Sequence, residues 1–289
     1  MNSTLGACLV VCMCVCICVS VYVAVRVHMQ MRVHAPQNDR HRCLPISAGI
    51  LTHYAPKTLS HTLQSYKAAG LLNVLQDVFV IIQHSSRADD ERRVCEFFNV
   101  RYVLMNDNGH MANGFRAIYD HARHDVLLFL ENDFILHEDQ TCDDVSAFFD
   151  CSLRFLSNGY DVVRARSRAR PGDPNYAVLH HDDNKPLLTT HMSESMYWEP
   201  HPHRVHVDKI FLLSNTVLGP WYTSTAAYCN YTNNPFLCRR SFFTTAILPH
   251  LVFGENIEDR LTPIWATMPY KCVFGPGLFT HDRSFDGHS

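Results

Sequence analysis

Short apolar runs alternate with amphipathic stretches along residues 44–130. A run of four to eight apolar residues between polar segments is typical of a strand buried on both faces of a sheet. The sequence predicts four strands in this part of the chain, at residues 46–51, 78–82, 101–105 and 126–130. The second and fourth read VFVII and VLLFL and contain no polar residue.

Helical spacing fills the gaps between these strands. Pro56 suits the first turn of a helix, and Leu59, Leu63 and Tyr66 then recur on one face until Gly70 ends the pattern. Strands that alternate with helices predict an α/β fold with a mainly parallel sheet and ligands at the carboxyl ends of its strands. Two more helices are predicted, at residues 88–98, which begin with acidic residues, and at residues 111–123.

The second half of the chain is less regular. His- and Pro-rich loops are expected over residues 171–206, an apolar strand over 210–213 and a helix over 239–248. We therefore expect one globular domain over residues 44–289, which is long enough to bury a sizeable core.

Residues 7–25 carry no charge and have the length that a helix needs to cross a bilayer. A cleaved signal peptide is the alternative, but its basic n-region and small-residue cleavage site are both missing. We expect a membrane anchor over residues 1–25 and a stem over residues 26–43, which have no apolar period. This interpretation makes the chain a single-pass membrane protein of the Golgi or the endoplasmic reticulum.

Two features disagree about the side of the membrane on which the domain lies. Arginines follow the apolar segment and none precedes it, which by the positive-inside rule places the domain in the cytosol. Against this, Asn230-Tyr231-Thr232 is a glycosylation sequon, which functions only in a lumen. We prefer the lumen, and the orientation stays open at this point.

Of the 12 cysteines, those beyond the apolar segment are Cys43, Cys95, Cys142, Cys151, Cys229, Cys238 and Cys272. None belongs to a CxxC motif, which excludes a zinc ribbon. The pairs Cys142/Cys151 and Cys229/Cys238 are close enough in sequence for disulfides in an oxidising lumen, and buried free thiols are the equal alternative.

Charge limits the choice of partner. The chain has 25 basic and 28 acidic residues, a net charge of -3. Nucleic acid is excluded as the main partner because binding phosphates along a strand requires a basic surface. This small net charge is compatible with a small anionic ligand that is bound through a metal ion.

The acidic triplet Glu131-Asn132-Asp133 directly follows the strand at residues 126–130. Two carboxylates at the end of a buried strand are costly unless they have partners, and a metal ion is the usual one. An acidic turn without a metal is the alternative.

The segment 106–133 resembles the nucleotide-sugar glycosyltransferases of the GT-A fold, and the family-2-like inverting enzymes in particular. In that family a polar turn leads into a helix, an apolar strand and a DxD motif, of which Glu131-Asn132-Asp133 is a variant. The resemblance implies a Mn²⁺ or Mg²⁺ cofactor bound by Asp133, with Glu131 and Asn132 near the donor. It also implies transfer of a sugar from a nucleoside diphosphate sugar to a hydroxyl of a glycan, protein or lipid.

The chain departs from the family at residues 83–86, where many members have an aspartate that helps to hold the nucleotide. Nucleotide contacts are therefore expected instead from Asp107 or from Thr52, His53 and Tyr54.

A second acidic motif, FGENIED, covers residues 253–259. Its carboxylates lie at the start of a predicted helix, where the helix dipole favours negative charge, so capping is one interpretation. The motif also resembles the family's catalytic-base motif. A carboxylate that takes the proton of the acceptor hydroxyl lowers the barrier to attack. We expect this base to be Asp259, then Glu258, then Glu255.

Two further sets of residues are candidates for the donor side. Family members often place a histidine after a late strand, where it completes the metal site, and His281 fits that position. Arg164 and Arg166 belong to an alternating run of arginines that continues to Arg168 and Arg170. On a strand these four side chains would share one face and suit a diphosphate or an anionic acceptor, whereas a solvated basic loop is the alternative.

Two other functions are compatible with the sequence. One is a catalytically inactive binding protein on the same fold. The other is a zinc hydrolase, although the chain has no HExxH motif. Its ligands would come from the His-rich stretch, which contains His180, His181, Asp182, Asp183, His191, His201, His203 and His206.

Overall fold

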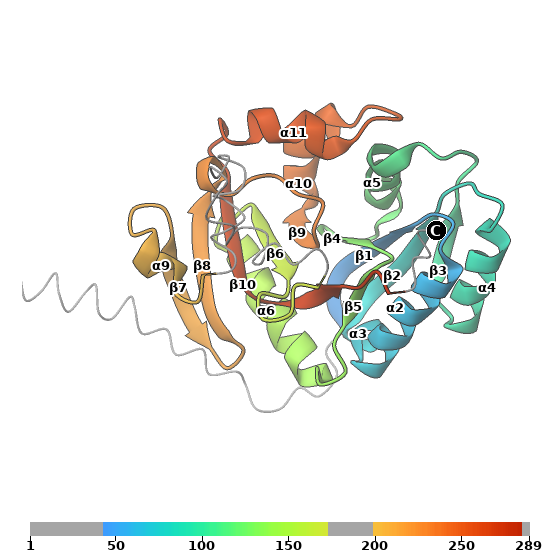
Figure 1. Cartoon of the computed structure of the whole chain (residues 1–289), viewed down its shortest axis with the longest axis horizontal. Helices are drawn as coiled ribbons and strands as arrows, with labels where there is room; N and C mark the ends of the chain where they lie inside the picture. The colour runs from blue at the N-terminus through green and yellow to red at the C-terminus, as the bar shows by residue number, and fades with distance from the viewer. Residues whose placement is uncertain (1–42, 173–198, 285–289) are drawn as a thin grey trace, which may run out of the picture. The chain divides into compact units, whose positions relative to one another are not determined.

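The computed structural model describes residues 43–172 and 199–284 (Figure 1). The strands form a ten-stranded mixed sheet in the order β3-β2-β1-β4-β9-β6-β10-β8-β7, and β5 pairs with β10. The expected anchor, the stem up to residue 42 and most of the His-rich stretch lie outside the described residues. Within those residues, no helix is both long enough and apolar enough to cross a membrane.

The first half of the chain has the predicted alternation of strands and helices. The strands β1 (Leu44–Thr52), β2 (Leu75–Ile82), β3 (Arg101–Leu104) and β4 (Val126–Glu131) are parallel neighbours. The helices between them are α2 (Pro56–Ala68), the short α3 (Leu71–Val74), α4 (Ala88–Phe97) and α5 (His110–His121). The predicted α/β class is therefore confirmed.

The second half makes the sheet mixed, so a mainly parallel sheet was a wrong prediction. The strand β9 (Phe236–Arg239) inserts antiparallel between β4 and β6 (Val162–Arg166). The long strand β10 (Lys271–His281) runs parallel to β6 and antiparallel to β8 (Gly219–Thr225) and β5 (Phe134–Leu136). The edge strand β7 (Phe211–Thr216) pairs with β8.

The remaining helices include one that was not predicted and one whose predicted regular form differs from the structure. The helix α6 (Cys142–Ser157) begins at a capping box formed by Thr141 and Asp144. The expected helix over 239–248 is divided into α10 (Arg240–Phe242), η2 (Phe243–Ile247) and η3 (Leu248–His250), because Pro249 lacks the N–H that a regular helix needs. The other elements are α9 (Pro202–Val205), η1 (Ala226–Tyr228) and α11 (Ile257–Trp265).

Both faces of the sheet are buried, which explains the continuous apolar runs. Successive side chains of a strand point to opposite faces. Leu128 and Leu130 of β4 therefore belong to the core shared with α2 and α6, whereas Leu127 and Phe129 belong to the core on the other face. The carboxyl end of β4 is consequently held rigidly from both sides.

All seven cysteines among the described residues are free. Cys142 and Cys151 lie on the single helix α6, about 13 Å apart along its axis, which is too far for a disulfide. Cys229 and Cys238 are buried thiols. The alternative of free thiols is thus the one that the structure shows.

Candidate functional site

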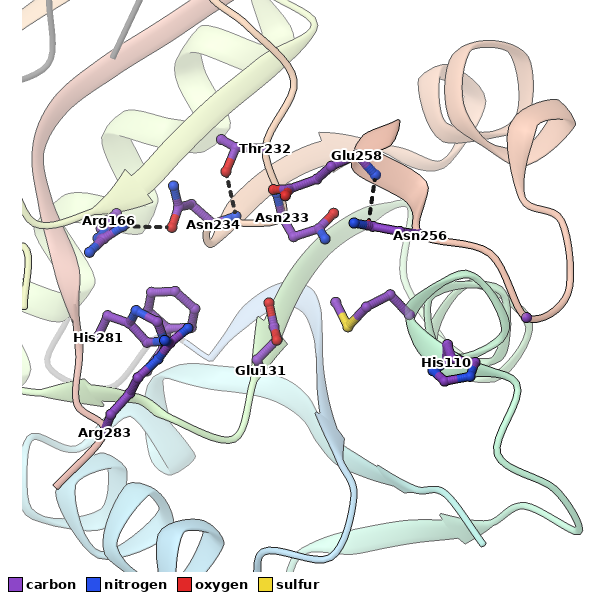
Figure 2. Close-up of a pocket in the computed structure, with 13 residues that line it drawn as sticks. His110, Glu131, Arg166, Thr232, Asn233, Asn234, Asn256, Glu258, His281 and Arg283 are labelled. Carbon is purple, nitrogen blue, oxygen red and sulfur yellow. Dashed lines mark hydrogen bonds between the residues drawn. The ribbon is translucent and has the colours of Figure 1, made fainter. Parts of the chain in front are cut away.

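A cavity of about 480 Å³ lies where the carboxyl end of β4 meets β10 and the start of α11 (Figure 2). Ligands of open α/β sheets bind at such an end of the strands. The charged residues that line the cavity are Glu131, Arg166, Glu258, Arg283 and, when protonated, His110 and His281. Glu131, Glu258 and His281, each predicted from a different motif, therefore line the same cavity.

Asp133 and His281 form a buried pair beside this cavity. The antiparallel pairing of β5 with β10 places His281 opposite Phe134, and its ring stacks on the Phe134 ring at a centroid distance of 4.6 Å. The His281 Nε2 atom lies 2.7 Å from Asp133 Oδ2. Asp133 Oδ1 and His281 Nδ1 are buried and have no hydrogen-bond partner among the described residues.

These two side chains fit a divalent cation that is only partly held by protein. Mg²⁺ and similar ions are often bound through one or two protein ligands together with substrate phosphates and water. The orphaned Oδ1 atom of Asp133 is an oxygen ligand of the required kind, and a buried orphaned acceptor is costly without such a partner. Within residues 43–172 and 199–284 no three His, Cys, Asp or Glu side chains gather into a complete metal site.

Glu131 is the second carboxylate at this strand end. The pKa of Glu131 is raised to about 8, first by burial and then by the nearby charges of Asp133 and Glu258, while Arg283 opposes these effects. A cation near Asp133 would have the opposite effect on this pKa. In the absence of metal this raised pKa favours the neutral, protonated form of Glu131 at neutral pH.

This raised pKa predicts pH-dependent stability of the metal-free protein. A glutamate of the unfolded chain titrates near 4.5 and Glu131 near 8, so the folded state binds more protons between these values. The free energy of unfolding should fall as the pH rises through this window, by up to about 1.4 kcal/mol per pH unit. Urea unfolding in EDTA at several pH values measures the slope. The Glu131→Gln variant should lose this contribution, and an unchanged slope in the variant would contradict the assignment.

Of the three acidic candidates at α11, Glu258 is the one that lines the cavity. Its Oε1 atom accepts a hydrogen bond of 2.7 Å from the backbone N–H of Asn233, which fixes the carboxylate. Asp259 is exposed and is not part of the cavity wall, and Glu255 forms an ion pair of 2.6 Å with Arg260. The helix cap is the side chain of Asn256, which accepts from the N–H of Glu258 at 3.1 Å.

The candidates for nucleotide contacts lie at the ends of β1 and β3, outside the cavity wall. Thr52 donates a hydrogen bond of 2.6 Å to Glu91, a fully buried glutamate whose Oε2 atom has no partner among the described residues. The register of β1 with β4 pairs Leu51 with Glu131, so Thr52 follows directly beside the acidic triplet. Asn132 lies within that triplet, and its carbonyl oxygen accepts from Thr62 at 2.5 Å.

Two of these candidate nucleotide-binding residues, His53 and Asp107, contact asparagine side chains. His53 Nε2 lies 3.0 Å from the amide nitrogen of Asn108, and Asp107 accepts from Asn113 at 2.9 Å. Tyr54 is more than half exposed and has a φ of +59°. Its ring is therefore presented to solvent beside the strand ends. No sequence pattern pointed to Glu91, which resembles an ordinary acidic residue of a first helical turn.

Of the two interpretations of the arginine run, the structure contradicts the one that places four side chains on one strand face. β6 ends at Arg166, because the backbone N–H of Arg168 bonds to Pro276 of β10 instead of continuing the strand. Arg164 is buried and donates to the carbonyl oxygen of Asn230, away from the cavity. Arg170 forms an exposed ion pair of 2.5 Å with Asp139. Among the four, Arg166 alone lines the cavity.

Sequence reasoning missed several residues of the cavity wall. Arg283 points toward His281 and Glu131 in Figure 2, and its Nε atom lies 3.4 Å from His281 Nε2. Its position two residues after the predicted ligand was the available signal. Thr232, Asn233 and Asn234 come from the loop that contains the sequon. Asn230 itself is only partly exposed and its Oδ1 atom is buried.

The described part of the His-rich stretch offers no comparable cluster. His201, His203 and His206 lie at or beside α9, and no metal-binding group of three includes them. The five other candidate zinc ligands lie outside the described residues.

No family model matches the chain, and no curated protein matches it. Solved structures do match. These matches are at low sequence identity. One match is TarS of S. aureus, residues 1–349, with 12% identity and a TM-score of 0.48 over 83% of this chain and 60% of that one.

Another match is glucosyl-3-phosphoglycerate synthase from Mycobacterium tuberculosis in complex with Mn²⁺, uridine-diphosphate-glucose and phosphoglyceric acid. It shares 14% identity and a TM-score of 0.44 over 82% of this chain and 71% of that one. The chain thus spans three fifths of the TarS fragment and about seven tenths of the synthase.

Proposed function

We propose that the chain is a metal-dependent glycosyltransferase that moves a sugar from a nucleoside diphosphate sugar to an acceptor hydroxyl with inversion. The observation that carries the proposal is the buried pair of Asp133 and His281 with its orphaned polar atoms. It lies beside a cavity whose opposite wall holds Glu258. Such a transfer requires a metal on the donor side and a base on the acceptor side of one cavity.

On the donor side, Asp133 and His281 would hold Mn²⁺ or Mg²⁺. When bound, this ion supplies positive charge that stabilises the leaving diphosphate. Arg283 is exposed at the cavity and carries a further positive charge toward the same region. Thr52, His53, Tyr54 and Asp107 would contact the nucleoside from the neighbouring strand ends.

On the acceptor side, Glu258 would take the proton of the attacking hydroxyl. The backbone N–H of Asn233 orients this carboxylate and leaves its second oxygen for the acceptor. The base lies across the cavity from His281 (Figure 2). Attack from that side occurs on the face opposite the leaving group, which inverts the configuration at the anomeric carbon.

A screen of nucleoside diphosphates and their sugars by thermal shift tests the proposal. At least one nucleotide should raise Tm in the presence of Mn²⁺ and not in EDTA, because binding to the folded state alone stabilises it. Donor hydrolysis by the same protein then separates an enzyme from an inactive binding protein, which would bind without turnover. Stabilisation by Zn²⁺ alone, with no response to any nucleotide, would refute the proposal in favour of a zinc protein.

We also propose that residues 7–25 anchor the protein in a Golgi or endoplasmic reticulum membrane, because they form an uncharged run of spanning length. Alkaline carbonate extraction of membranes should leave the full-length chain in the pellet. Release into the supernatant would contradict the anchor. A mobility shift on glycosidase treatment that is lost in Asn230→Gln would place the domain in the lumen, whereas protease sensitivity of the domain in sealed vesicles would place it in the cytosol.

A further inference from the structure

Charge is distributed unequally around the cavity. Arg166, Arg283 and His281 lie together on one side of it in Figure 2. The carboxylate of Glu258 lies on the other side, and Glu131 lies between the two sides. The half of the cavity next to the proposed base therefore contains no arginine or lysine side chain among the residues that line it.

The lining on the Glu258 side consists of neutral hydrogen-bonding groups. Asn233 and Asn256 contribute carboxamides, and Thr232 contributes a hydroxyl. The carboxamide oxygen of Asn234 accepts a hydrogen bond of 2.9 Å from Arg166, so Asn234 belongs to the basic side. Asn233 comes from the loop that precedes β9 and Asn256 caps α11, so two separate elements direct amides into one space (Figure 2).

The side chain of Asn233 has unused hydrogen-bonding capacity. Its Oδ1 atom is buried and has no partner among the described residues. A carboxamide also has two N–H donors, so it can both accept from one hydroxyl and donate to another. Asn256 uses its Oδ1 atom for the helix cap, which leaves its NH₂ group to donate. Such groups match the paired donor and acceptor character of a sugar hydroxyl.

An anionic acceptor would meet an unfavourable field on this side. A phosphate or carboxylate placed near the amides would lie close to the carboxylate of Glu258, which lines the same part of the cavity. Like charges held close together in a partly buried cavity repel strongly, and no arginine or lysine on this side compensates.

We propose, on the basis of the proposed function, that the acceptor is an uncharged polyhydroxylated molecule, namely a neutral sugar residue or glycan. The carboxamides of Asn233 and Asn256 orient it toward Glu258. Phosphorylated and carboxylated acceptors are rejected by the same carboxylate, that of Glu258, which activates the hydroxyl. The diphosphate of the donor belongs to the other side, near Arg283 and His281.

The test compares matched acceptors with the full-length chain in detergent, with Mn²⁺ and a donor already shown to be hydrolysed. Methyl glucoside and glucose 6-phosphate, and the corresponding galactose and N-acetylglucosamine pairs, are offered at equal concentration. At least one neutral member should stimulate donor consumption at least tenfold more than its phosphorylated partner. Equal stimulation, preference for the phosphorylated member, or no stimulation by either would overturn the inference about the acceptor.

Variants of Asn233 test whether this side chain determines the acceptor preference. Asn233→Ala keeps the backbone N–H that orients Glu258 and should raise KM for the neutral acceptor about tenfold, with nucleotide binding unchanged. Asn233→Lys should reduce the preference for neutral over phosphorylated acceptors by at least tenfold. The control Asn158→Ala, on the exposed end of α6, should change neither.

Failure of the proposed function has a different signature. Then no donor would be hydrolysed and no nucleotide would bind with Mn²⁺. If donors are hydrolysed but the variants leave the acceptor preference unchanged, the transferase assignment stands and the acceptor inference falls.

Discussion

Asp133→Asn is expected to abolish Mn²⁺-dependent nucleotide binding while the domain stays folded. Changes in the groups that only orient a metal ligand already cost about 10–100-fold in affinity, so loss of the ligand charge itself should cost at least about 100-fold. The asparagine is nearly isosteric and can still accept a hydrogen bond from His281 Nε2, which lies 2.7 Å from the aspartate. Thermal shift with a nucleoside diphosphate, with and without Mn²⁺, measures both the binding and the fold.

The matched control is Asp139→Asn. Asp139 makes the same type of carboxylate contact, an ion pair of 2.5 Å with Arg170, but it is exposed and lies outside the cavity. This variant should bind nucleotide like the wild type, because an exposed ion pair contributes little. If Asp133→Asn kept an unchanged Mn²⁺ dependence, the metal would have to bind elsewhere.

Glu258→Gln is expected to lower kcat by about 10²–10⁴-fold, the usual contribution of a general base. The glutamine can still accept the hydrogen bond from the N–H of Asn233, so the loop and the fold should be preserved. Donor and metal affinity should change little, because Asp133 and His281 lie on the other side of the cavity. Transfer rate, donor binding and Tm are measured on the same preparations.

Three variants of the same segment separate catalysis from helix capping. Asp259→Asn and Glu255→Gln should keep transfer within about threefold, because one residue is exposed outside the cavity and the other is paired with Arg260. Asn256→Ala removes the cap and should cost about 1 kcal/mol of stability. If Asp259→Asn were the variant that lost turnover, the order of preference taken from the sequence would be restored and Glu258 would be structural.

The first half of the fold was predictable because its signals are local. Each strand there is a continuous apolar run, and each helix follows within a few residues. α6 also had a local signal, the capping box of Thr141 and Asp144, which the sequence analysis did not use. The strands β5, β9 and β10 were not predicted because their pairing partners lie far along the chain, whereas β8 was missed although it forms a hairpin with β7.

The arginine run shows how a distant element overrides a local pattern. Alternation over residues 163–170 predicted a continuous strand, but the backbone N–H groups of Ser167 and Arg168 bond to Phe279 and Pro276 of β10. The chain therefore leaves the strand direction after Arg166. For the site, the resemblance to a family located Asp133 and His281, whereas the carboxamides and Arg283 required the three-dimensional arrangement.

The pairing of β5 with β10 also determines when the metal position can exist. Asp133 and His281 are 148 residues apart in the chain, and β9, which joins β4 to β6, also comes from the later part of the sequence. During synthesis the parallel strands β1 to β4 can pack first, since domains fold as their segments emerge from the ribosome. A nascent chain that ends before residue 281 has the acidic strand end without its histidine. If the proposed metal is bound, its binding by both residues would have to wait until translation has passed residue 281.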